Sequence, residues 1–198
     1  SVMFIAIWTH QTVPSAWADS YLVPIPKPGS DLRDPTNWRG IAIQSHLKKM
    51  FEACVRRYMT SEGWLRADPL QLGFQSRLGA IDAVFVADEL TSRYAQLKKP
   101  LIMTLLDIRK AYDRTPRALV WSKLRRRAVP EHVVGVLQGL MDECSIRIRL
   151  GTDLSVPIPL EVGVPQGDVL SPDLFNVYVD DLPNRVRAAC APFQGCPR

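Results

Sequence analysis

Cysteine and histidine are scarce in this chain of 198 residues, which has four cysteines and three histidines. No two cysteines form a Cys-x-x-Cys pair, and the histidines share no spacing typical of metal ligands. We therefore expect neither a zinc site nor a disulfide-rich scaffold. This cysteine usage fits a reducing environment, in the nucleus or the cytoplasm.

Long hydrophobic runs are also missing. The apolar stretch at residues 2–8 is too short to span a bilayer, and no basic region precedes it. We therefore expect no signal peptide, no membrane helix and no membrane partner. The chain begins with Ser1 rather than methionine, which leads us to expect a fragment of a longer protein.

What the sequence does contain favours a folded, basic protein. Its hydrophobic content of 46% can build a core, and its charged content of 23% is close to the globular average. The net charge of +5 favours an anionic partner, first of all nucleic acid, although many ordinary proteins are this basic. Basic runs at residues 56–57, 98–99 and 125–127 could follow a nucleic-acid backbone, but such runs are also common on solvated surfaces.

The hydrophobic periodicity indicates an α+β fold. Ser45 is placed as an N-cap, and Ser171 with Pro172 forms a favoured pair at the start of a helix. Apolar residues at helical spacing predict helices at residues 45–60, 80–96, 116–127 and 131–142, and from Ser171 onward.

The strands are predicted from shorter patterns. Residues 21–29 alternate apolar residues with prolines, which suits an edge strand. Residues 40–43 are a short apolar run, and residues 145–150 and 156–162 predict a β-hairpin. The first 20 residues show little organisation.

Asp107 follows a continuous apolar run at residues 101–106, which predicts a buried central strand. A carboxylate at the end of such a strand is held at the rim of a sheet, where it can bind Mg²⁺ together with substrate phosphates. A lone aspartate there could equally cap a helix or form a surface ion pair.

Residues 163–167, Gly-Val-Pro-Gln-Gly, form a second candidate site, called the glycine loop below. Glycines allow the backbone to approach a ligand closely. The amide of Gln166 can both donate and accept hydrogen bonds, which suits contact with a base or a sugar. We expect Asp107 to face this loop.

Taken in order, these segments resemble the reverse transcriptases of non-long-terminal-repeat (LINE-like) retrotransposons and their group II intron relatives. The resemblance covers roughly residues 20–183. The matching blocks are residues 25–29 (Ile-Pro-Lys-Pro-Gly), 37–43 (Asn-Trp-Arg-Gly-Ile-Ala-Ile), 105–113 (Leu-Leu-Asp-Ile-Arg-Lys-Ala-Tyr-Asp) and 163–183, with a looser match at 71–74 and Asp82.

The resemblance implies a right-hand polymerase fold with an incomplete palm. It divides the chain into a poorly defined segment at residues 1–20, fingers at 21–100, a partial palm at 101–183 and a divergent tail at 184–198. It also implies an RNA-directed DNA polymerase, which adds deoxynucleotides to a DNA primer on an RNA template with two Mg²⁺ ions. The oligomeric state is not indicated.

By the same resemblance, Asp107 and the carbonyl of Ile108 would bind metal. Lys27 and Arg39 match the finger positions that hold the incoming triphosphate. The chemistry agrees, because a guanidinium offers a planar fork to phosphate oxygens and an ammonium offers a compact charge.

Gln166 and Gly167 would contact the nucleotide as well. Tyr112 matches the aromatic position that lies under the sugar and excludes a 2′-hydroxyl, although a core aromatic is the alternative interpretation. Because RNA-copying RNA polymerases usually have a smaller polar residue at this position, Tyr112 argues against that second enzyme class.

Residues 178–181, Tyr-Val-Asp-Asp, imitate the paired aspartates that complete a polymerase site. Asp180 follows Pro172 by only eight residues, and eight residues advance a helix by about 12 Å. That leaves no room for a helix, a strand and a hairpin turn, so we predict that this pair is not catalytic and that the chain alone is inactive. A strand turn at 178–181 is the alternative.

Two other functions remain open at this point. The chain could be a catalytically dead, RNA-binding remnant similar to maturases, or part of an RNA-dependent RNA polymerase. A decayed copy that does not fold is a third possibility.

Overall fold

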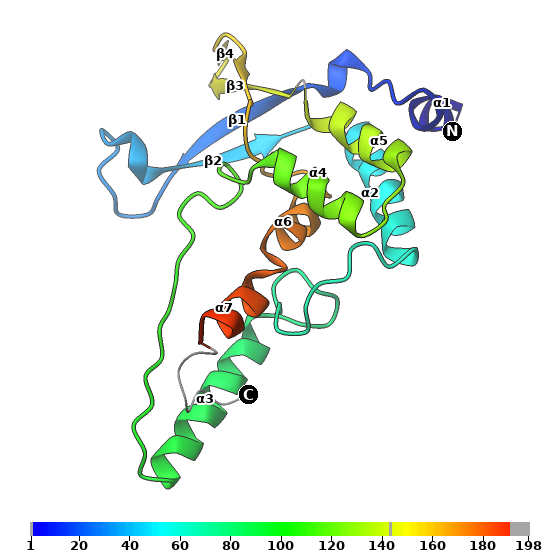
Figure 1. Cartoon of the computed structure of the whole chain (residues 1–198). Coiled ribbons are helices and arrows are strands. Elements are labelled where there is room, and N and C mark those ends of the chain that lie inside the picture. The colour runs from blue at the N-terminus through cyan, green and yellow to red at the C-terminus, as the bar shows by residue number, and fades with distance from the viewer. Residues whose placement is uncertain (1, 143, 191–198) are drawn as a thin grey trace.

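The computed structural model describes residues 2–142 and 144–190 and has a mixed α+β architecture (Figure 1). In chain order the elements are α1 (Val2–His10), η1 (Ser15–Trp17), β1 (Asp19–Pro26), η2 (Pro35–Asn37), β2 (Trp38–Ile43), α2 (His46–Ser61), α3 (Ala80–Gln96), α4 (Arg117–Arg126), α5 (Glu131–Met141), β3 (Ser145–Leu150), β4 (Asp153–Leu154), β5 (Ile158–Pro159), α6 (Ser171–Val179) and α7 (Leu182–Cys190).

The sheet has the strand order β2-β1-β3-β4, and β5 also pairs with β3. β1 pairs antiparallel with β2 over its residues 21–26 and parallel with β3 over its residues 19–22. The expected edge strand therefore has neighbours on both sides at residues 21–22 and pairs with β2 alone at residues 23–26.

The prolines of β1 explain why its pairing with β3 ends at Leu22. The backbone N–H of Lys27 donates to the carbonyl of Asn37 at 2.9 Å, on the β2 side. Because strand amides alternate in direction, the amides of even-numbered residues in β1 point away from β2, toward β3. Pro24 and Pro26 have no N–H to donate on that side, and the pairing with β3 stops at Leu22.

The periodic helices are confirmed. α2, α3, α4 and α5 lie within two residues of the predicted bounds, and the hydroxyl of Ser45 accepts a hydrogen bond from the N–H of Lys48 at 3.5 Å. α6 begins at Ser171 as predicted. The N-terminal segment, in contrast, is more ordered than expected, because it forms α1 and buries Ile7 and Trp17.

The predicted hairpin is only partly formed. β3 matches the first predicted strand, and Gly151 turns the chain with a φ of 63°. In place of a second long strand, β4 and β5 each pair two residues with β3.

The hydrophobic core lies mainly between α2, α4, α5 and α6, beside the sheet (Figure 1). The buried apolar residues of these helices are Phe51, Val55 and Met59 from α2, Val120, Trp121 and Leu124 from α4, Val133, Val134, Val136, Leu137, Leu140 and Met141 from α5, and Leu174 and Val177 from α6.

The expectation of a buried strand at residues 101–106 was wrong. This segment forms no strand, and Ile102 is 91% exposed and Leu105 92% exposed. An interior strand needs neighbours to pair its N–H and C=O groups, and no described strand pairs with this segment. Its backbone therefore remains in water.

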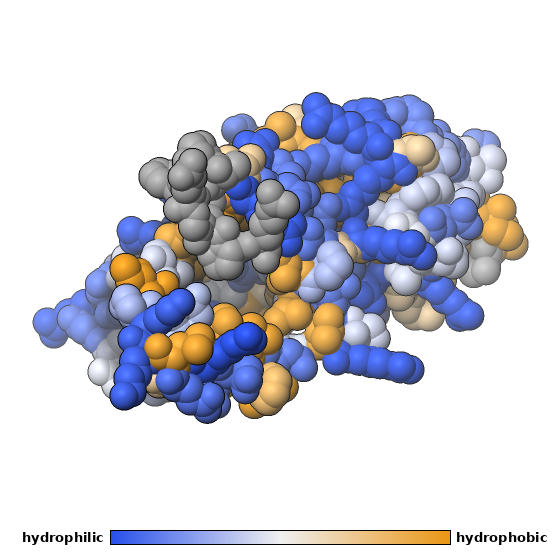
Figure 2. Space-filling model, turned by 60° about the horizontal axis from the view of Figure 1, so that its bottom comes forward, coloured by the Kyte–Doolittle hydropathy of each residue, from blue (hydrophilic) through white to orange (hydrophobic). Residues whose placement is uncertain are grey.

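α3 and the segment after it extend away from the rest of the fold (Figure 1). α3 has no buried residue. In Figure 2, in which the bottom of Figure 1 comes forward, apolar side chains lie at the surface among hydrophilic ones. The large exposed apolar residues of this region are Ile81, Val84, Phe85, Val86, Leu90, Leu97, Ile102, Met103, Leu105 and Leu106.

None of the helices in the part of the chain that the structure describes combines the length and the apolar character required to cross a membrane.

Two leucines of α4 allow a test of where the core lies. Leu124 is 0% exposed and Leu119 is 50% exposed. We expect Leu124→Ala to lower the free energy of unfolding by about 2–5 kcal/mol, because it removes buried contacts and leaves a cavity. Leu119→Ala should change it by less than about 0.5 kcal/mol. Urea denaturation measures both, and equal losses would contradict this core.

Candidate functional site

One cavity brings three of the predicted site residues together. Lys27, Arg39 and Gln166, which are far apart in the sequence, line a single cavity of about 380 Å³. The remaining lining residues are Ser20, Leu22, Trp38, Gly40, Ala42, Asp113, Ile146, Leu160, Val162, Val164 and Pro165. The sheet therefore forms one wall, and the glycine loop with the chain leading into it forms another.

The two cations of this cavity are positioned by the antiparallel pair β1 and β2. Lys27 directly follows β1, and its ammonium donates to the carbonyl of Thr36 at 3.0 Å. Arg39 lies in β2 opposite Ile25 and is exposed, and its side chain makes no hydrogen bond or ion pair with the described residues. The Arg39 guanidinium thus has its donors available for an anion.

The glycine loop needs glycine at both ends. Gly163 has a φ of 86° and Gly167 a φ of 97°, which lie in a backbone region that residues other than glycine rarely adopt. A Cβ at Gly163 would lie 2.6 Å from the carbonyl oxygen of Tyr112. A Cβ at Gly167 would lie 3.2 Å from the carbonyl oxygen of Ala42, so the loop lies directly against β2.

Arg117, at the start of α4, fixes the first end of the glycine loop. Its buried guanidinium donates to the carbonyls of Gly163 at 2.6 Å, Met141 at 2.7 Å and Leu160 at 2.6 Å. One side chain therefore joins α4, the end of α5 and the chain that enters the loop.

A buried ion cluster fixes the other end of the loop. The ammonium of Lys48 in α2 lies 3.0 Å from a carboxylate oxygen of Asp168 and 3.7 Å from one of Glu52. Glu52 also accepts a hydrogen bond from the N–H of Val169 at 2.8 Å. α2 thereby holds the two residues that follow Gly167.

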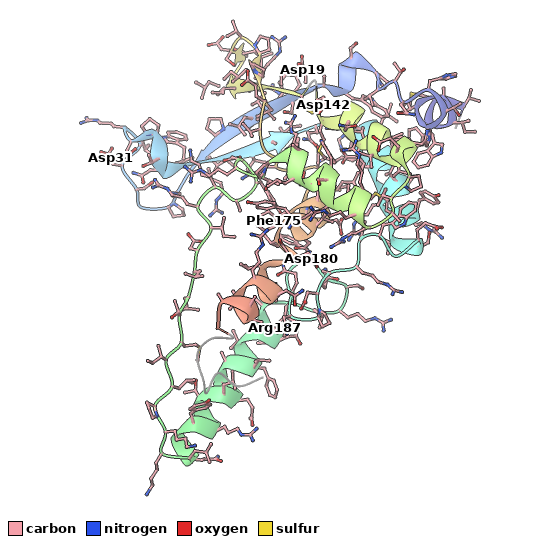
Figure 3. All side chains as sticks on the ribbon, in the orientation of Figure 1. Asp19, Asp31, Asp142, Phe175, Asp180 and Arg187 are labelled. Carbon is pink, nitrogen blue, oxygen red and sulfur yellow. The ribbon has the colours of Figure 1, made fainter. Side chains whose placement is uncertain are left out.

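Tyr112 lies beside the cavity without lining it. Its ring packs against Phe175 of α6, which is labelled in Figure 3, with ring centroids 5.5 Å apart, and the ring centroid of Phe74 lies 6.3 Å from that of Tyr112. Burial raises the pKa of the Tyr112 hydroxyl. Its carbonyl accepts from the N–H of Val164 at 2.9 Å, and its neighbour Asp113 lines the cavity.

The structure does not bring Asp107 to this cavity. Asp107 is exposed and makes no hydrogen bond or ion pair with the described residues. Ile108 lines a different cavity, of about 430 Å³, together with Lys123 and Asp181. The expectation that Asp107 faces the glycine loop depended on a strand at 101–106, and that strand is not formed.

The Tyr-Val-Asp-Asp segment lies at the end of α6 and not at a strand turn, which agrees with the helix predicted from Ser171 onward. Asp180 follows the last residue of α6 and accepts from Arg127 at 2.6 Å (Figure 3). A hydrogen bond from Lys123 lowers the pKa of Asp181 to about 2, although burial acts in the opposite direction. Both carboxylates are thus engaged in ion pairs, Asp181 with Lys123 of α4 and Asp180 with Arg127, which directly follows α4.

The match to a known protein family includes most of the residues that line the cavity of Lys27, Arg39 and Gln166. The chain belongs to the reverse transcriptase (RNA-dependent DNA polymerase) family, whose profile matches residues 25–196.

The relatives come from retrotransposons. The chain is 30% identical over 171 residues to a retrovirus-related Pol polyprotein from the type-1 retrotransposable element R2 of Popillia japonica, covering 86% of this chain and 24% of that protein. It is 28% identical over 189 residues to a probable RNA-directed DNA polymerase from transposon BS of Drosophila melanogaster, covering 92% of this chain and 20% of that protein. It is 27% identical over 174 residues to the RNA-directed DNA polymerase from mobile element jockey of Drosophila melanogaster, covering 86% of this chain and 19% of that protein. The chain therefore spans about a quarter or less of the length of these relatives.

Sequence reasoning missed the residues that hold the glycine loop in place. Arg117 carried a signal, because a cation in the first turn of a helix opposes the helix dipole and therefore suggests another partner. Lys48 and Glu52 resembled an ordinary surface pair four residues apart. Nothing in the sequence around Asp168 distinguished its carboxylate from an exposed one.

Replacing Arg117 by lysine keeps the positive charge but removes the planar guanidinium, whose three nitrogens donate to three carbonyls. We expect Arg117→Lys to lower the free energy of unfolding by roughly 2–5 kcal/mol, because buried carbonyls of Gly163, Met141 and Leu160 lose their donors. The matched control is Arg114→Lys, since Arg114 is exposed and should change stability by less than about 0.5 kcal/mol. Guanidinium denaturation of both variants measures the difference, and similar small losses would show that the fork is dispensable.

Proposed function

We propose that this chain carries the part of an RNA-directed DNA polymerase that receives the incoming deoxynucleoside triphosphate. The observation that carries the proposal is the cavity between Lys27, Arg39 and Gln166. The names of the relatives support the same activity, since two of them are named as RNA-directed DNA polymerases of transposable elements.

The chemistry of the cavity fits a nucleotide. Its volume of about 380 Å³ is within the range of small-molecule sites. Arg39 offers a fork and Lys27 a point charge to phosphate oxygens, while Gln166 presents an amide to the sugar or base. In the proposed complex Tyr112 lies at the sugar side, because its neighbour Asp113 lines the cavity, and Gly167 lets the loop approach the nucleotide.

The polymer partners in this proposal are an RNA template and a DNA primer, in a right-hand polymerase fold. Residues 21–100 would belong to the fingers and residues 101–183 to the palm. The sheet takes strands from both ranges, since β1 pairs with β3, so the two parts would share one sheet. The location in the nucleus or the cytoplasm stays a prediction.

Two Mg²⁺ ions are part of the proposed reaction, with Asp107 and the carbonyl of Ile108 as predicted ligands. The described residues do not assemble such a site, because they contain no group of three or more histidine, cysteine, aspartate or glutamate side chains able to hold a metal ion. The described residues therefore assign no reaction step to a metal ion.

Nucleotide binding tests the cavity directly. We expect Lys27→Ala and Arg39→Ala each to weaken the affinity of the 198-residue chain for a deoxynucleoside triphosphate by about 10- to 100-fold, since each removes a charge-assisted contact of about 1.5–3 kcal/mol. Calorimetric titration in magnesium buffer measures the affinity. The control is Arg33→Ala, because Arg33 is an exposed arginine in the loop between β1 and β2 and does not line the cavity. Equal losses in Arg33→Ala and Arg39→Ala would overturn the proposed site.

Primer extension tests the metal prediction. We expect no measurable extension by the 198-residue chain, because Asp107 is exposed and lies outside the cavity. Incorporation of labelled deoxynucleotide on an RNA template measures it, with a complete reverse transcriptase as the positive control. Extension that disappears in Asp107→Ala would contradict this expectation.

A further inference from the structure

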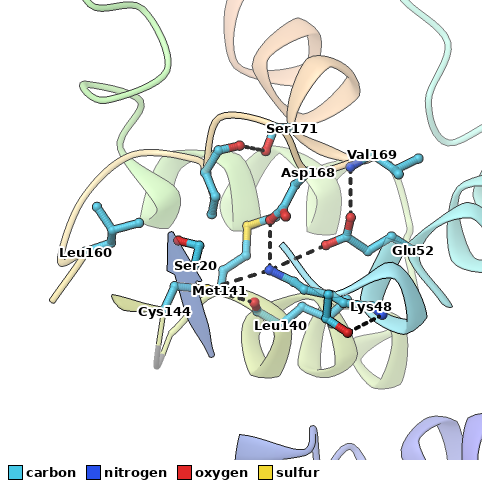
Figure 4. Close-up of polar contacts among 12 residues, drawn as sticks. Ser20, Lys48, Glu52, Leu140, Met141, Cys144, Leu160, Asp168, Val169 and Ser171 are labelled. Atoms are coloured by element: carbon cyan, nitrogen blue, oxygen red, sulfur yellow. Dashed lines mark hydrogen bonds and ion pairs between the residues drawn. The ribbon is translucent and has the colours of Figure 1, made fainter. Parts of the chain in front are cut away.

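Lys48, Glu52 and Asp168 form a sealed group of charges between α2 and the end of the glycine loop (Figure 4). The side chains of Lys48, Glu52 and Asp168 are 2%, 0% and 0% exposed. Water therefore does not stabilise these charges, and they must be compensated by one another.

The charges of this cluster do not balance if both carboxyls are ionised. Lys48 brings one positive charge, and although burial acts to lower its pKa, the attraction of Asp168 and Glu52 raises it. The neighbouring Cys144, whose sulfur lies 3.9 Å from the Lys48 ammonium, stays a neutral thiol because burial raises its pKa. The positive charge of Arg117 acts on Cys144, but the groups that most shift the pKa of Glu52 and of Asp168 do not include Arg117. One negative charge would then be left without a partner.

The cluster also contains buried acceptors without donors. Three buried oxygens have no hydrogen-bond partner among the described residues, namely Oε1 of Gln44, Oε1 of Glu52 and Oδ1 of Asp168. All three are acceptors when both carboxyls are ionised. A proton on one carboxyl would remove the surplus charge and supply a donor.

The carboxyl that holds this proton is Glu52. Burial, followed by the charge of Asp168, raises the pKa of Glu52 to about 7, while Lys48 acts in the opposite direction. Burial also raises the pKa of Asp168, but Lys48 lies closer to Asp168 and favours its charged form. The two carboxyls titrate as a pair, in which the pKa of Glu52 is raised to about 7.

We propose that Lys48, Glu52 and Asp168 form a positioning latch that holds the glycine loop against β2, and that one proton shared by Glu52 and Asp168 stabilises the closed latch. Asp168 directly follows Gly167, and Glu52 accepts from the N–H of Val169. Loss of the proton leaves an unpaired charge in the sealed cluster, which opens the latch and releases Gln166 from its place in the cavity. This role goes beyond nucleotide binding, because it concerns the loop in the free protein.

The pH dependence follows from the direction of the shift. The pKa of Glu52 is raised from 4.5 to about 7 in the closed latch. The closed state binds more protons than the open state between these values, so its stability is fully present below pH 4.5 and is lost as the pH rises through about 7. For one group with these two pKa values, the closed-to-open ratio falls about tenfold between pH 6 and pH 8.

Amide hydrogen exchange of the 198-residue chain tests the latch without any nucleotide. We expect the protection factor of the Val169 amide to fall about tenfold between pH 6 and pH 8. In Glu52→Gln, which keeps an uncharged side chain of the same shape, this protection should not change with pH. The matched control is Glu62→Gln, an exposed glutamate at the end of the same helix, which should behave as the wild-type chain does. Protection that is independent of pH in the wild-type chain, or a pH dependence that survives in Glu52→Gln, would overturn the proposal.

A direct titration covers the case in which Glu52→Gln does not fold. In the wild-type chain, ¹³C NMR of the glutamate side-chain carboxyls should show one group titrating near pH 7, and ordinary titration of all of them near pH 4–5 would overturn the latch. Deoxynucleotide affinity measured over the same pH range separates the two proposals. If the Val169 amide responds to pH but no nucleotide binds at any pH, the latch stands and the proposed function fails.

Discussion

The glycine loop is held at both ends by buried cations, and the candidate site depends on this arrangement. At one end the guanidinium of Arg117 donates hydrogen bonds to the carbonyls of Gly163, Leu160 and Met141. At the other end Lys48 and Glu52 of α2 hold Asp168 and Val169. Both cations reach the loop from the core helices, so the position of Gln166 is coupled to the packing of α2, α4 and α5. A catalytic or binding side chain on a loop is precise only when groups around it fix the loop.

Much of the fold could be predicted from local sequence, because helix periodicity and capping are local properties. Ser45 marked the start of α2, and Pro116 marked the start of α4. The buried face of α2 was nevertheless predicted only in part, since its apolar spacing includes Phe51 and Val55, which are buried, and other residues that are exposed. Leu47, Met50 and Tyr58 were expected inside but are 49%, 59% and 40% exposed, while Lys48 and Glu52 are buried. Hydrophobicity alone cannot reveal a buried charge whose partner lies more than a hundred residues away.

The strand at residues 101–106 failed for a related reason. An apolar run predicts burial, but a strand exists only when neighbouring chain segments satisfy its backbone, and this information is not local. Lys27, Arg39 and Gln166 could be predicted as one site because the resemblance to reverse transcriptases implied the same ligand, the incoming nucleotide, for each of them. The opposite holds for Asp180 and Asp181, whose motif resembled a metal site but whose carboxylates are bound to Arg127 and Lys123.

The two prolines of β1 have a consequence for assembly. Beyond Leu22 the strand has a neighbour only on the β2 side, which leaves one flank unpaired next to the cavity. Unpaired flanks invite β-augmentation, in which an extended peptide or a misfolded chain extends the sheet. Pro24 and Pro26 remove the amide donors from this flank, so that it offers only acceptors to an incoming strand. Two residues outside the lining of the cavity thus make this flank a poor template for another strand.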